Sequence, residues 1–91
     1  MHEPLSPVEA KERIRDILID GRVFFTSHAQ DELDADELQR TDCVNVLRGG
    51  VVRPAEYEHG GWRYRVDTAR MAVIIEFHGV DTIIVVTAWR Y

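Results

Sequence analysis

The sequence predicts an α+β domain in which N-terminal helices pack on one face of a mostly antiparallel sheet of four to five strands. Apolar residues recur at helical spacing before residue 50 and at a spacing of two after it. Helices followed by a run of strands with tight turns are typical of this class. Because a chain of 91 residues buries only about 60 to 65% of its unfolded surface, residues 1–91 are expected to form a single domain around one core.

The first helix is predicted over residues 7–20. Ser6 is a typical N-cap residue, proline suits the first helical position, and Glu9 completes a capping box with Ser6. Its apolar residues recur at helical spacing and should face the core: Ala10, Ile14, Ile17 and Leu18. Gly21 is expected to end the helix.

Residues 22–26 are predicted to form a short strand that leads directly into a helix over residues 28–34. Ser27 and Gln30 have the spacing of a capping box, so His28 is expected to open this helix. The positive end of the helix dipole disfavours a charged imidazolium there, which favours a neutral His28 that can accept a proton. The alternative is that His28 is only a polar surface residue.

A third helix is predicted over residues 42–48 and is expected to end at the glycine pair 49–50. Its inward-facing residues should be Cys43, Val44 and Leu47.

The second half of the chain is predicted to form strands. Residues 51–52 start a strand that Pro54 confines to a sheet edge. Three further strands, separated by tight turns near Ala69-Arg70 and Val80-Asp81, are expected at 62–68, 71–78 and 82–90. The last of them is apolar on both sides, which favours a central position in the sheet.

Alternation along these strands assigns their side chains to two faces, provided that each turn has two residues. The core face should hold Trp62, Tyr64, Val66, Val73, Ile75, Phe77, Ile84, Val86 and Ala88. The opposite face should hold Arg63, Arg65, Asp67, Glu76, His78, Val85, Thr87, Trp89 and Tyr91, with Arg63 directly across from Glu76. A register shift of one residue would exchange the two faces.

The second face is the predicted location of chemistry. The guanidinium groups of Arg63 and Arg65 match phosphate oxygens and stabilise charge that a phosphodiester gains in the transition state. Without a metal site, cleavage would use the 2′-hydroxyl of RNA as the nucleophile, which restricts the substrate to RNA. The alternative for Arg63 is a purely structural cross-strand ion pair with Glu76.

The candidate residues fall into two sets. Glu76 or His78 would accept a proton and His28 or Tyr91 would deliver one, so the candidate catalytic residues are His28, Arg63, Arg65, Glu76, His78 and Tyr91. Aromatic side chains stack on unpaired bases, and the candidate RNA-binding residues are Arg70, Thr87, Trp89 and Arg90.

Composition and charge limit which partners, metals and cofactors can be expected. The net charge is −5, and the acid is concentrated in the run DELDADE at residues 31–37, which is typical of a solvated helix face but also attracts basic partners. The single cysteine, Cys43, excludes an internal disulfide, and no Cys or His pair has zinc-ligand spacing, so neither a metal nor a cofactor is expected. No signal peptide or membrane span is recognisable, which favours a cytoplasmic protein without membrane contact.

A family resemblance accompanies these patterns. ILIDGRVFFTSHAQDELDADEL, followed by DCVNVLRGG, resembles the N-terminal half of the MqsR-type toxins of bacterial toxin–antitoxin systems. The chain also resembles the small domains known as domain of unknown function 4258, which share a Thr-x-His-Ala start and a C-terminal VVT strand; residues 26–29 and 85–87 match these patterns. The resemblance covers residues 14–90, and small apolar and turn residues carry much of it.

The resemblance implies a RelE-like fold and a metal-independent endoribonuclease that cuts messenger RNA, either free or associated with the ribosome, and is silenced by a cognate antitoxin. It places Arg63 near a catalytic glutamine of the toxins, and Arg90 or Tyr91 near a C-terminal lysine. The chain departs from the pattern in two places. An aliphatic residue near Val73 replaces an expected tyrosine, and Glu32 stands where relatives often have arginine.

Two hypotheses follow. In the first, the protein is a toxin-like ribonuclease that uses the sheet face together with His28. In the second, it is a non-catalytic toxin-fold domain that binds a protein partner through its acidic helices or through Trp89 and Tyr91. The negative net charge favours the second hypothesis, whereas the arginine and histidine side chains of the sheet favour the first.

Overall fold

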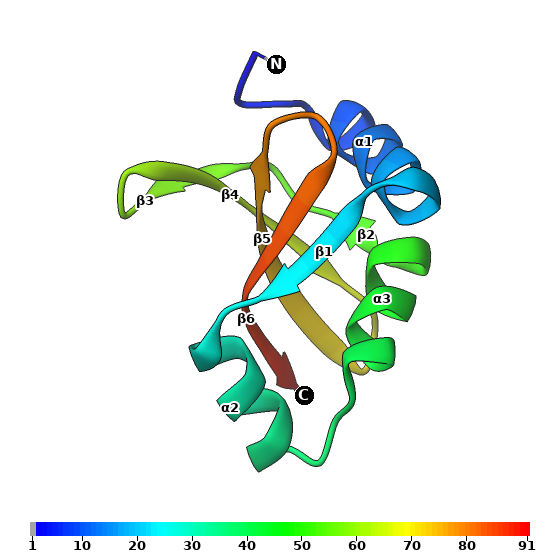
Figure 1. Cartoon of the computed structure of the whole chain (residues 1–91), viewed down its shortest axis with the longest axis vertical. Helices are drawn as coiled ribbons and strands as arrows, with labels where there is room; N and C mark the ends of the chain where they lie inside the picture. The colour runs from blue at the N-terminus through cyan, green and yellow to red at the C-terminus, as the bar shows by residue number, and fades with distance from the viewer. Residues whose placement is uncertain (1) are drawn as a thin grey trace.

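The computed structural model describes residues 2–91 and confirms the α+β class. Three helices and six strands follow one another within these residues (Figure 1). Their order is α1 (Pro7–Asp20), β1 (Arg22–Phe25), α2 (Ser27–Ala35), α3 (Arg40–Gly49), β2 (Val51–Val52), β3 (Glu56–Glu58), β4 (Gly61–Asp67), β5 (Met71–His78) and β6 (Thr82–Arg90). The sheet thus has one strand more than the expected maximum, because the short segment Glu56–Glu58 forms a hairpin with β4.

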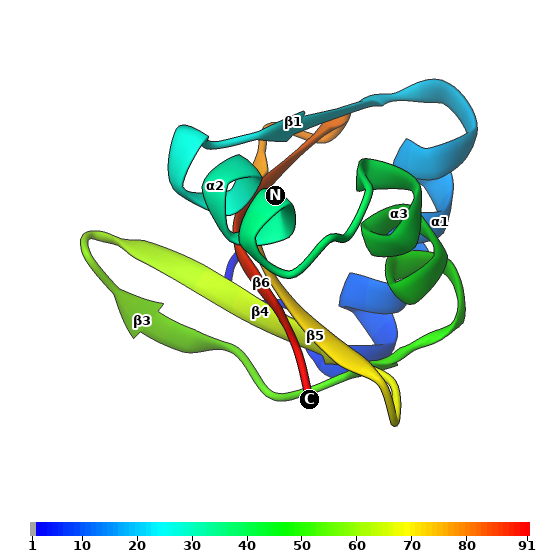
Figure 2. The same ribbon diagram turned by 90° about the horizontal axis from the view of Figure 1, so that it is seen from below.

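The strands are arranged in the order β1-β6-β5-β4-β2, with β3 paired to β4 beside this path. β1 runs parallel to β6 and all other pairs are antiparallel. β6 therefore lies between β1 and β5, the central position that its two apolar sides predict. α1 and α3 lie together on one side of the sheet, and the β3–β4 hairpin extends away from them (Figure 2).

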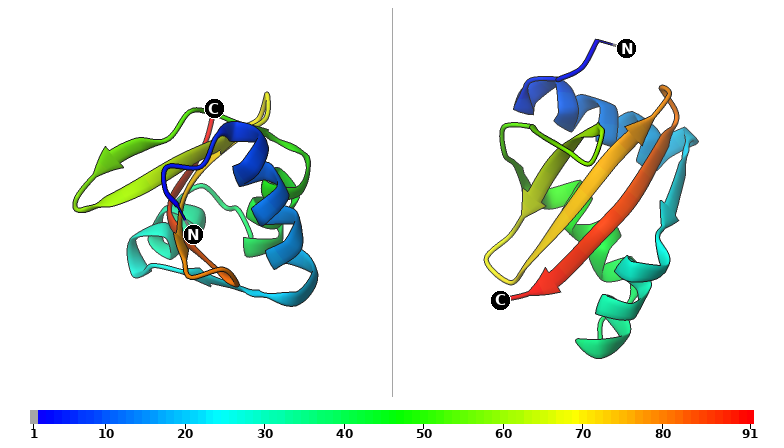
Figure 3. Two further views of the ribbon diagram at one scale, coloured as in Figure 1. Left: turned by 90° about the horizontal axis from the view of Figure 1, so that it is seen from above. Right: turned by 90° about the vertical axis from the view of Figure 1, so that its left-hand side faces the viewer.

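The other side of β4, β5 and β6, which α1 and α3 leave uncovered, is called the open face below; Figure 3 (right) looks onto it. The core lies between the opposite side of the strands and the helices. Its fully buried members from the helices include Ile14, Leu33 and Leu47. Its fully buried members from the sheet include Tyr64, Val66, Val73, Ile75, Ile83, Val85 and Ala88.

The predicted start of α1 is confirmed. The Glu9 backbone N–H donates to Ser6 Oγ at 3.2 Å, and the Ser6 N–H donates to Glu9 Oε1 at 2.9 Å. The hydrogen bond from the Ser6 backbone N–H, followed by that from the Ser6 side chain, lowers the pKa of the Glu9 carboxyl. The helix ends at Gly21, as expected, but the backbone there is extended. Glycine is required for a different reason: a Cβ atom would lie 2.2 Å from the Asp81 carbonyl oxygen.

Replacing Gly21 by alanine is expected to destabilise the fold by about 1 to 3 kcal/mol, because the added methyl group forces β1 and the β5–β6 turn apart. Gly49→Ala is the matched control, since a Cβ atom there has no neighbour within 4 Å. Alanine favours helix, so this control should leave the melting temperature unchanged or raise it slightly. Thermal unfolding of both variants measures the difference, and equal stabilities would contradict the close approach at Gly21.

Two details of the other helices differ from expectation. α2 begins one residue earlier because Thr26, rather than Ser27, is its N-cap; Thr26 Oγ1 accepts the Ala29 N–H at 3.0 Å. His28 is therefore the second residue of the helix. α3 extends over Arg40–Gly49, and Val46 is buried in the core whereas Val44 is only half-buried.

The register of β6 against β5 differs from the prediction and changes which residues of β6 are buried. Tyr64 pairs with Ile75 and Val66 with Val73, as predicted. The β5–β6 turn, however, has three residues with Gly79 at φ +65°, and His78 pairs with Thr82. Ile75 consequently pairs with Val85 and Phe77 with Ile83, so Ile83 and Val85 are buried in place of the predicted Ile84 and Val86.

A β-bulge at Val86 restores the predicted register. Beyond it, Ile74 pairs with Thr87 and Val73 with Ala88. A bulge inserts one extra residue into one strand and so reverses which residues face the core. The prediction that Val85 lies on the open face was therefore wrong, whereas Thr87 and Trp89 do lie there.

Candidate functional site

One cluster of the open face is centred on Glu76. Its Oε2 accepts a hydrogen bond from Arg63 Nε at 3.0 Å, which confirms the predicted cross-strand pair. Its other oxygen, Oε1, lies 3.7 Å from His78 Nε2. The side chains of Arg63 and Glu76 are 20% and 22% exposed, whereas that of His78 is 63% exposed. A half-buried carboxylate thus lies between a guanidinium and an imidazole that reaches solvent.

A second cluster is centred on Asp67 at the far end of β4. Arg53 Nη2 lies 3.2 Å from Asp67 Oδ1, and Arg65 Nε lies 3.0 Å from Oδ2. The Tyr91 hydroxyl donates to Oδ2 at 3.2 Å and accepts a hydrogen bond from Arg65. The Arg65 guanidinium also lies 5.2 Å from the centre of the Trp89 ring. Asp67 therefore fixes the orientation of Arg65 beside two aromatic side chains.

Burial raises the pKa of the Asp67 carboxyl, but hydrogen bonds from Arg53, Tyr91 and Arg65 and the charge of Arg53 outweigh burial and hold this pKa below its ordinary value of 3.8. A carboxyl with a lowered folded-state pKa stabilises the fold above its unfolded-state pKa, and this stabilisation is lost as the pH falls through the folded-state value.

Asp67→Asn is accordingly expected to cost about 1 to 3 kcal/mol at neutral pH, because two arginines lose a charged hydrogen-bond acceptor. The difference from the wild type should shrink as the pH falls below about 4. Asp16→Asn, at an exposed position of α1, should behave like the wild type throughout. Chemical unfolding between pH 2 and 7 tests this, and a difference that does not depend on pH would refute the role of the ionised carboxylate.

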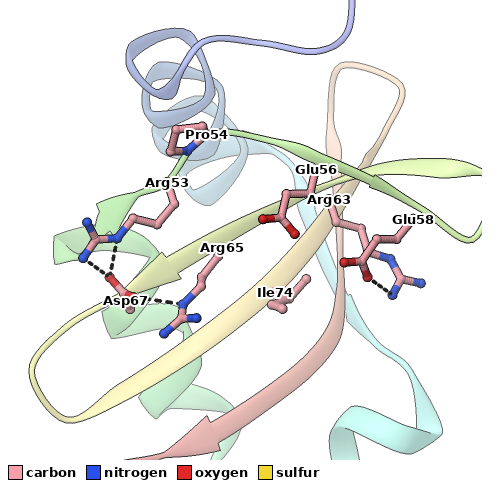
Figure 4. A pocket seen from close by; sticks show the side chains of 8 residues that line it. All are labelled: Arg53, Pro54, Glu56, Glu58, Arg63, Arg65, Asp67 and Ile74. Atoms are coloured by element: carbon pink, nitrogen blue, oxygen red, sulfur yellow. Dashed lines mark hydrogen bonds and ion pairs between the residues drawn. The ribbon is translucent and has the colours of Figure 1, made fainter.

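A hollow of about 420 Å³ joins the two clusters (Figure 4). It lies between the open face and the chain that connects β2 to β3. Its lining residues are Arg53, Pro54, Glu56, Glu58, Arg63, Arg65, Asp67 and Ile74. Arg53, Glu56 and Glu58 were not predicted as site residues, because no strand was expected over residues 56–58. The turn residues that follow, His59, Gly60 and Gly61, were the available signal for a hairpin.

His28 lies apart from these clusters. Its Nε2 is 3.4 Å from Glu32 Oε1 on α2, and its side chain is 70% exposed. The same Glu32 oxygen accepts hydrogen bonds from the Thr87 hydroxyl and, at 3.2 Å, from the Ala88 N–H. Four residues on, Asp36 Oδ2 accepts the Arg90 N–H at 3.2 Å. Two carboxylates of the acidic run thus cover the edge of β6, and His28 stands at the rim of the sheet.

The remaining two candidates lie away from the open face. Arg70 and Arg90 line a separate hollow of about 380 Å³ beside α3, together with Asp42 and Asn45. The Arg90 guanidinium also donates to the carbonyl oxygen of Asp36. The structure thus brings together Arg63, Glu76 and His78, and separately Arg65, Trp89 and Tyr91. His28 and Thr87 lie at Glu32 instead, and Arg70 and Arg90 share the hollow beside α3.

Within the described residues, His, Cys, Asp and Glu side chains do not gather in groups of three or more that could hold a metal ion. Every helix in residues 2–91 is too short or too polar to cross a lipid bilayer. Comparison of the chain with protein-family models, with curated proteins and with solved structures found no match.

Proposed function

We propose that this protein is a metal-independent endoribonuclease that cleaves messenger RNA and acts as the toxin of a bacterial toxin–antitoxin system. The observation that carries the proposal is the position of the Glu76 carboxylate between Arg63 and His78 on the open face. A carboxylate, an imidazole and a guanidinium supply a base, an acid and an anion-binding group. The family resemblance of the sequence supports the same activity, and a messenger RNA substrate implies a cytoplasmic protein.

Each group has a distinct role in the proposed reaction. Glu76 accepts the proton of a ribose 2′-hydroxyl, whose oxygen attacks the adjacent phosphorus atom. The bond from phosphorus to the 5′-oxygen breaks, and a protonated His78 donates its proton to that leaving oxygen. Arg63 binds a non-bridging phosphate oxygen and stabilises the charge that develops there. The products are a 2′,3′-cyclic phosphate and a 5′-hydroxyl end.

The second cluster suits a neighbouring nucleotide. Arg65 and the rings of Trp89 and Tyr91 offer one cation and two aromatic faces, and bases stack on both aromatic rings and guanidinium planes. Tyr91 and His28, the sequence-based candidates for the proton donor, have no contact with Glu76. His78 takes this role in the proposal because it is the imidazole beside the carboxylate.

Incubation of the purified protein with single-stranded RNA tests the activity. Cleavage should continue in EDTA and should leave 2′,3′-cyclic phosphate ends, whereas DNA and RNA with 2′-O-methyl groups should stay intact. Cleavage of DNA, or complete loss of activity in EDTA, would refute the mechanism.

A second function, binding of a protein partner without catalysis, is favoured by the net charge of −5 and by the acidic α2. Asp31 and Asp34 of α2, and Glu37 just beyond its end, are exposed and available to a basic partner. Induced expression in bacteria separates the two functions. A toxin should arrest growth, and co-expression of the neighbouring gene as its cognate antitoxin should restore growth. Arrest that persists in Glu76→Gln would favour partner binding over catalysis.

A further inference from the structure

We propose that Glu56 makes the hollow of the open face a guanine-binding subsite, so that cleavage follows guanosine. This inference rests on the proposed ribonuclease function and assigns its base specificity. Glu56 lies on β3 directly opposite Arg63 of β4. Since Arg63 in turn faces Glu76 of β5, the three side chains form a row across three strands.

The Glu56 carboxylate differs from the other carboxylates of the hollow in having no partner. Asp67 is held by two arginines, and Glu58 Oε2 lies 3.8 Å from Arg63 Nη1. Across the part of the chain that the structure describes, Glu56 makes neither a side-chain hydrogen bond nor an ion pair. Figure 4 shows its carboxylate directed into the hollow, between Arg65 and Ile74. Both of its oxygens are therefore free to accept hydrogen bonds from a ligand.

Guanine is the base that matches two free carboxylate oxygens. Its Watson–Crick edge presents two adjacent donors, the N1–H and the 2-amino group, which point in the same direction. Adenine and cytosine each present a single amino group on that edge next to an acceptor nitrogen, and uracil presents one N–H between two carbonyl groups. A carboxylate accepts hydrogen bonds only, so it repels the acceptors of these three bases.

The surroundings of Glu56 suit a flat aromatic ring. Ile74, half-buried on β5, lies beneath the carboxylate, and the Arg65 side chain borders the hollow with its guanidinium turned toward Asp67. An apolar side chain excludes water from one face of a base. The hollow of about 420 Å³ is also in the size range of small-ligand sites.

The spacing of the row connects base recognition to the reaction. Neighbouring strands lie about 4.8 Å apart, so the backbones at Glu56 and Glu76 are separated by roughly 10 Å. This separation is comparable to that between the Watson–Crick edge of a nucleotide and its own 3′-phosphate. A guanine held by Glu56 would therefore bring its 2′-hydroxyl and 3′-phosphate to Glu76 and Arg63.

Binding of nucleoside 3′-monophosphates tests the subsite without any cleavage. The wild type should bind 3′-GMP about 10- to 100-fold more tightly than 3′-AMP, 3′-CMP or 3′-UMP, as expected for one bidentate base contact. Inosine 3′-monophosphate lacks the 2-amino group and should lose most of this preference. Nuclear magnetic resonance titration gives the affinities and identifies the residues that respond, which should include Glu56 and Ile74.

Glu56→Gln should abolish the preference, because its amide group places a donor opposite a guanine donor. Glu12→Gln is the control: it removes the same charge from an exposed position of α1, outside the hollow, and should keep the preference. Equal affinities for all nucleotides in the wild type, or equal loss of preference in the two variants, would overturn the subsite. RNA cleavage without preference for guanosine would overturn the guanine-binding subsite but not the ribonuclease activity. Selective 3′-GMP binding without RNA cleavage would overturn the ribonuclease activity but not the base-binding subsite.

Discussion

Replacement of Glu76 by glutamine is expected to slow RNA cleavage by about 10²- to 10⁴-fold, the usual contribution of a general base. The amide has nearly the same size and its oxygen can still accept the hydrogen bond from Arg63, but it cannot take the proton of a 2′-hydroxyl. The substitution therefore removes the proposed chemistry with little change to the site. Single-turnover cleavage of a defined RNA under enzyme excess gives the rate.

Two controls separate catalysis from folding and charge. Glu58→Gln also removes a carboxylate next to Arg63, and it should cleave at a rate close to that of the wild type. Circular dichroism and thermal unfolding should show that Glu76→Gln remains folded. A folded Glu76→Gln protein with the wild-type rate would exclude Glu76 as the base.

Ile83→Ala is expected to destabilise the protein by about 2 to 5 kcal/mol, because it deletes a fully buried aliphatic side chain and leaves a cavity. Since domains of this kind are stable by only about 5 to 15 kcal/mol, the loss is a large part of the total. The neighbouring Ile84→Ala should cost less, since Ile84 is only half-buried on the open face. Urea unfolding of both variants provides the comparison.

The two variants, Ile83→Ala and Ile84→Ala, also test the register of β6. Uninterrupted alternation from a two-residue turn would bury Ile84 and expose Ile83, and the two costs would then be reversed. A larger loss in Ile84→Ala would therefore disprove both the three-residue turn and the bulge at Val86.

Elements with a local signal were predictable from the sequence. The Ser6 and Glu9 capping box fixed the start of α1, and the glycine pair fixed the end of α3 within one residue. The bulge at Val86 was not predictable, because residues 83–86 are all aliphatic and suit either face equally. Their orientation depends on pairing with β5 and β1, which is long-range information.

The contacts of the candidate site also differ in whether the sequence could predict them. The pairing of Arg63 with Glu76 follows from alternation and the two-residue turn at Ala69-Arg70. The contact between Arg53 and Asp67 depends on β2 pairing with β4, and the position of Glu56 depends on the β3–β4 hairpin. Neither pairing has a sequence signal as strong as the apolar alternation of β5.

The position of α2 has a consequence for self-association. Beyond Val85, the last residue of β6 that pairs with β1, Glu32 and Asp36 bind backbone N–H groups that would otherwise be free to join another chain. An exposed strand edge is a template for aggregation, and negatively charged side chains along it repel an approaching copy. The helix thus closes half of an apolar strand to strand addition, and leaves intermolecular β-pairing to the short outer strands β1, β2 and β3.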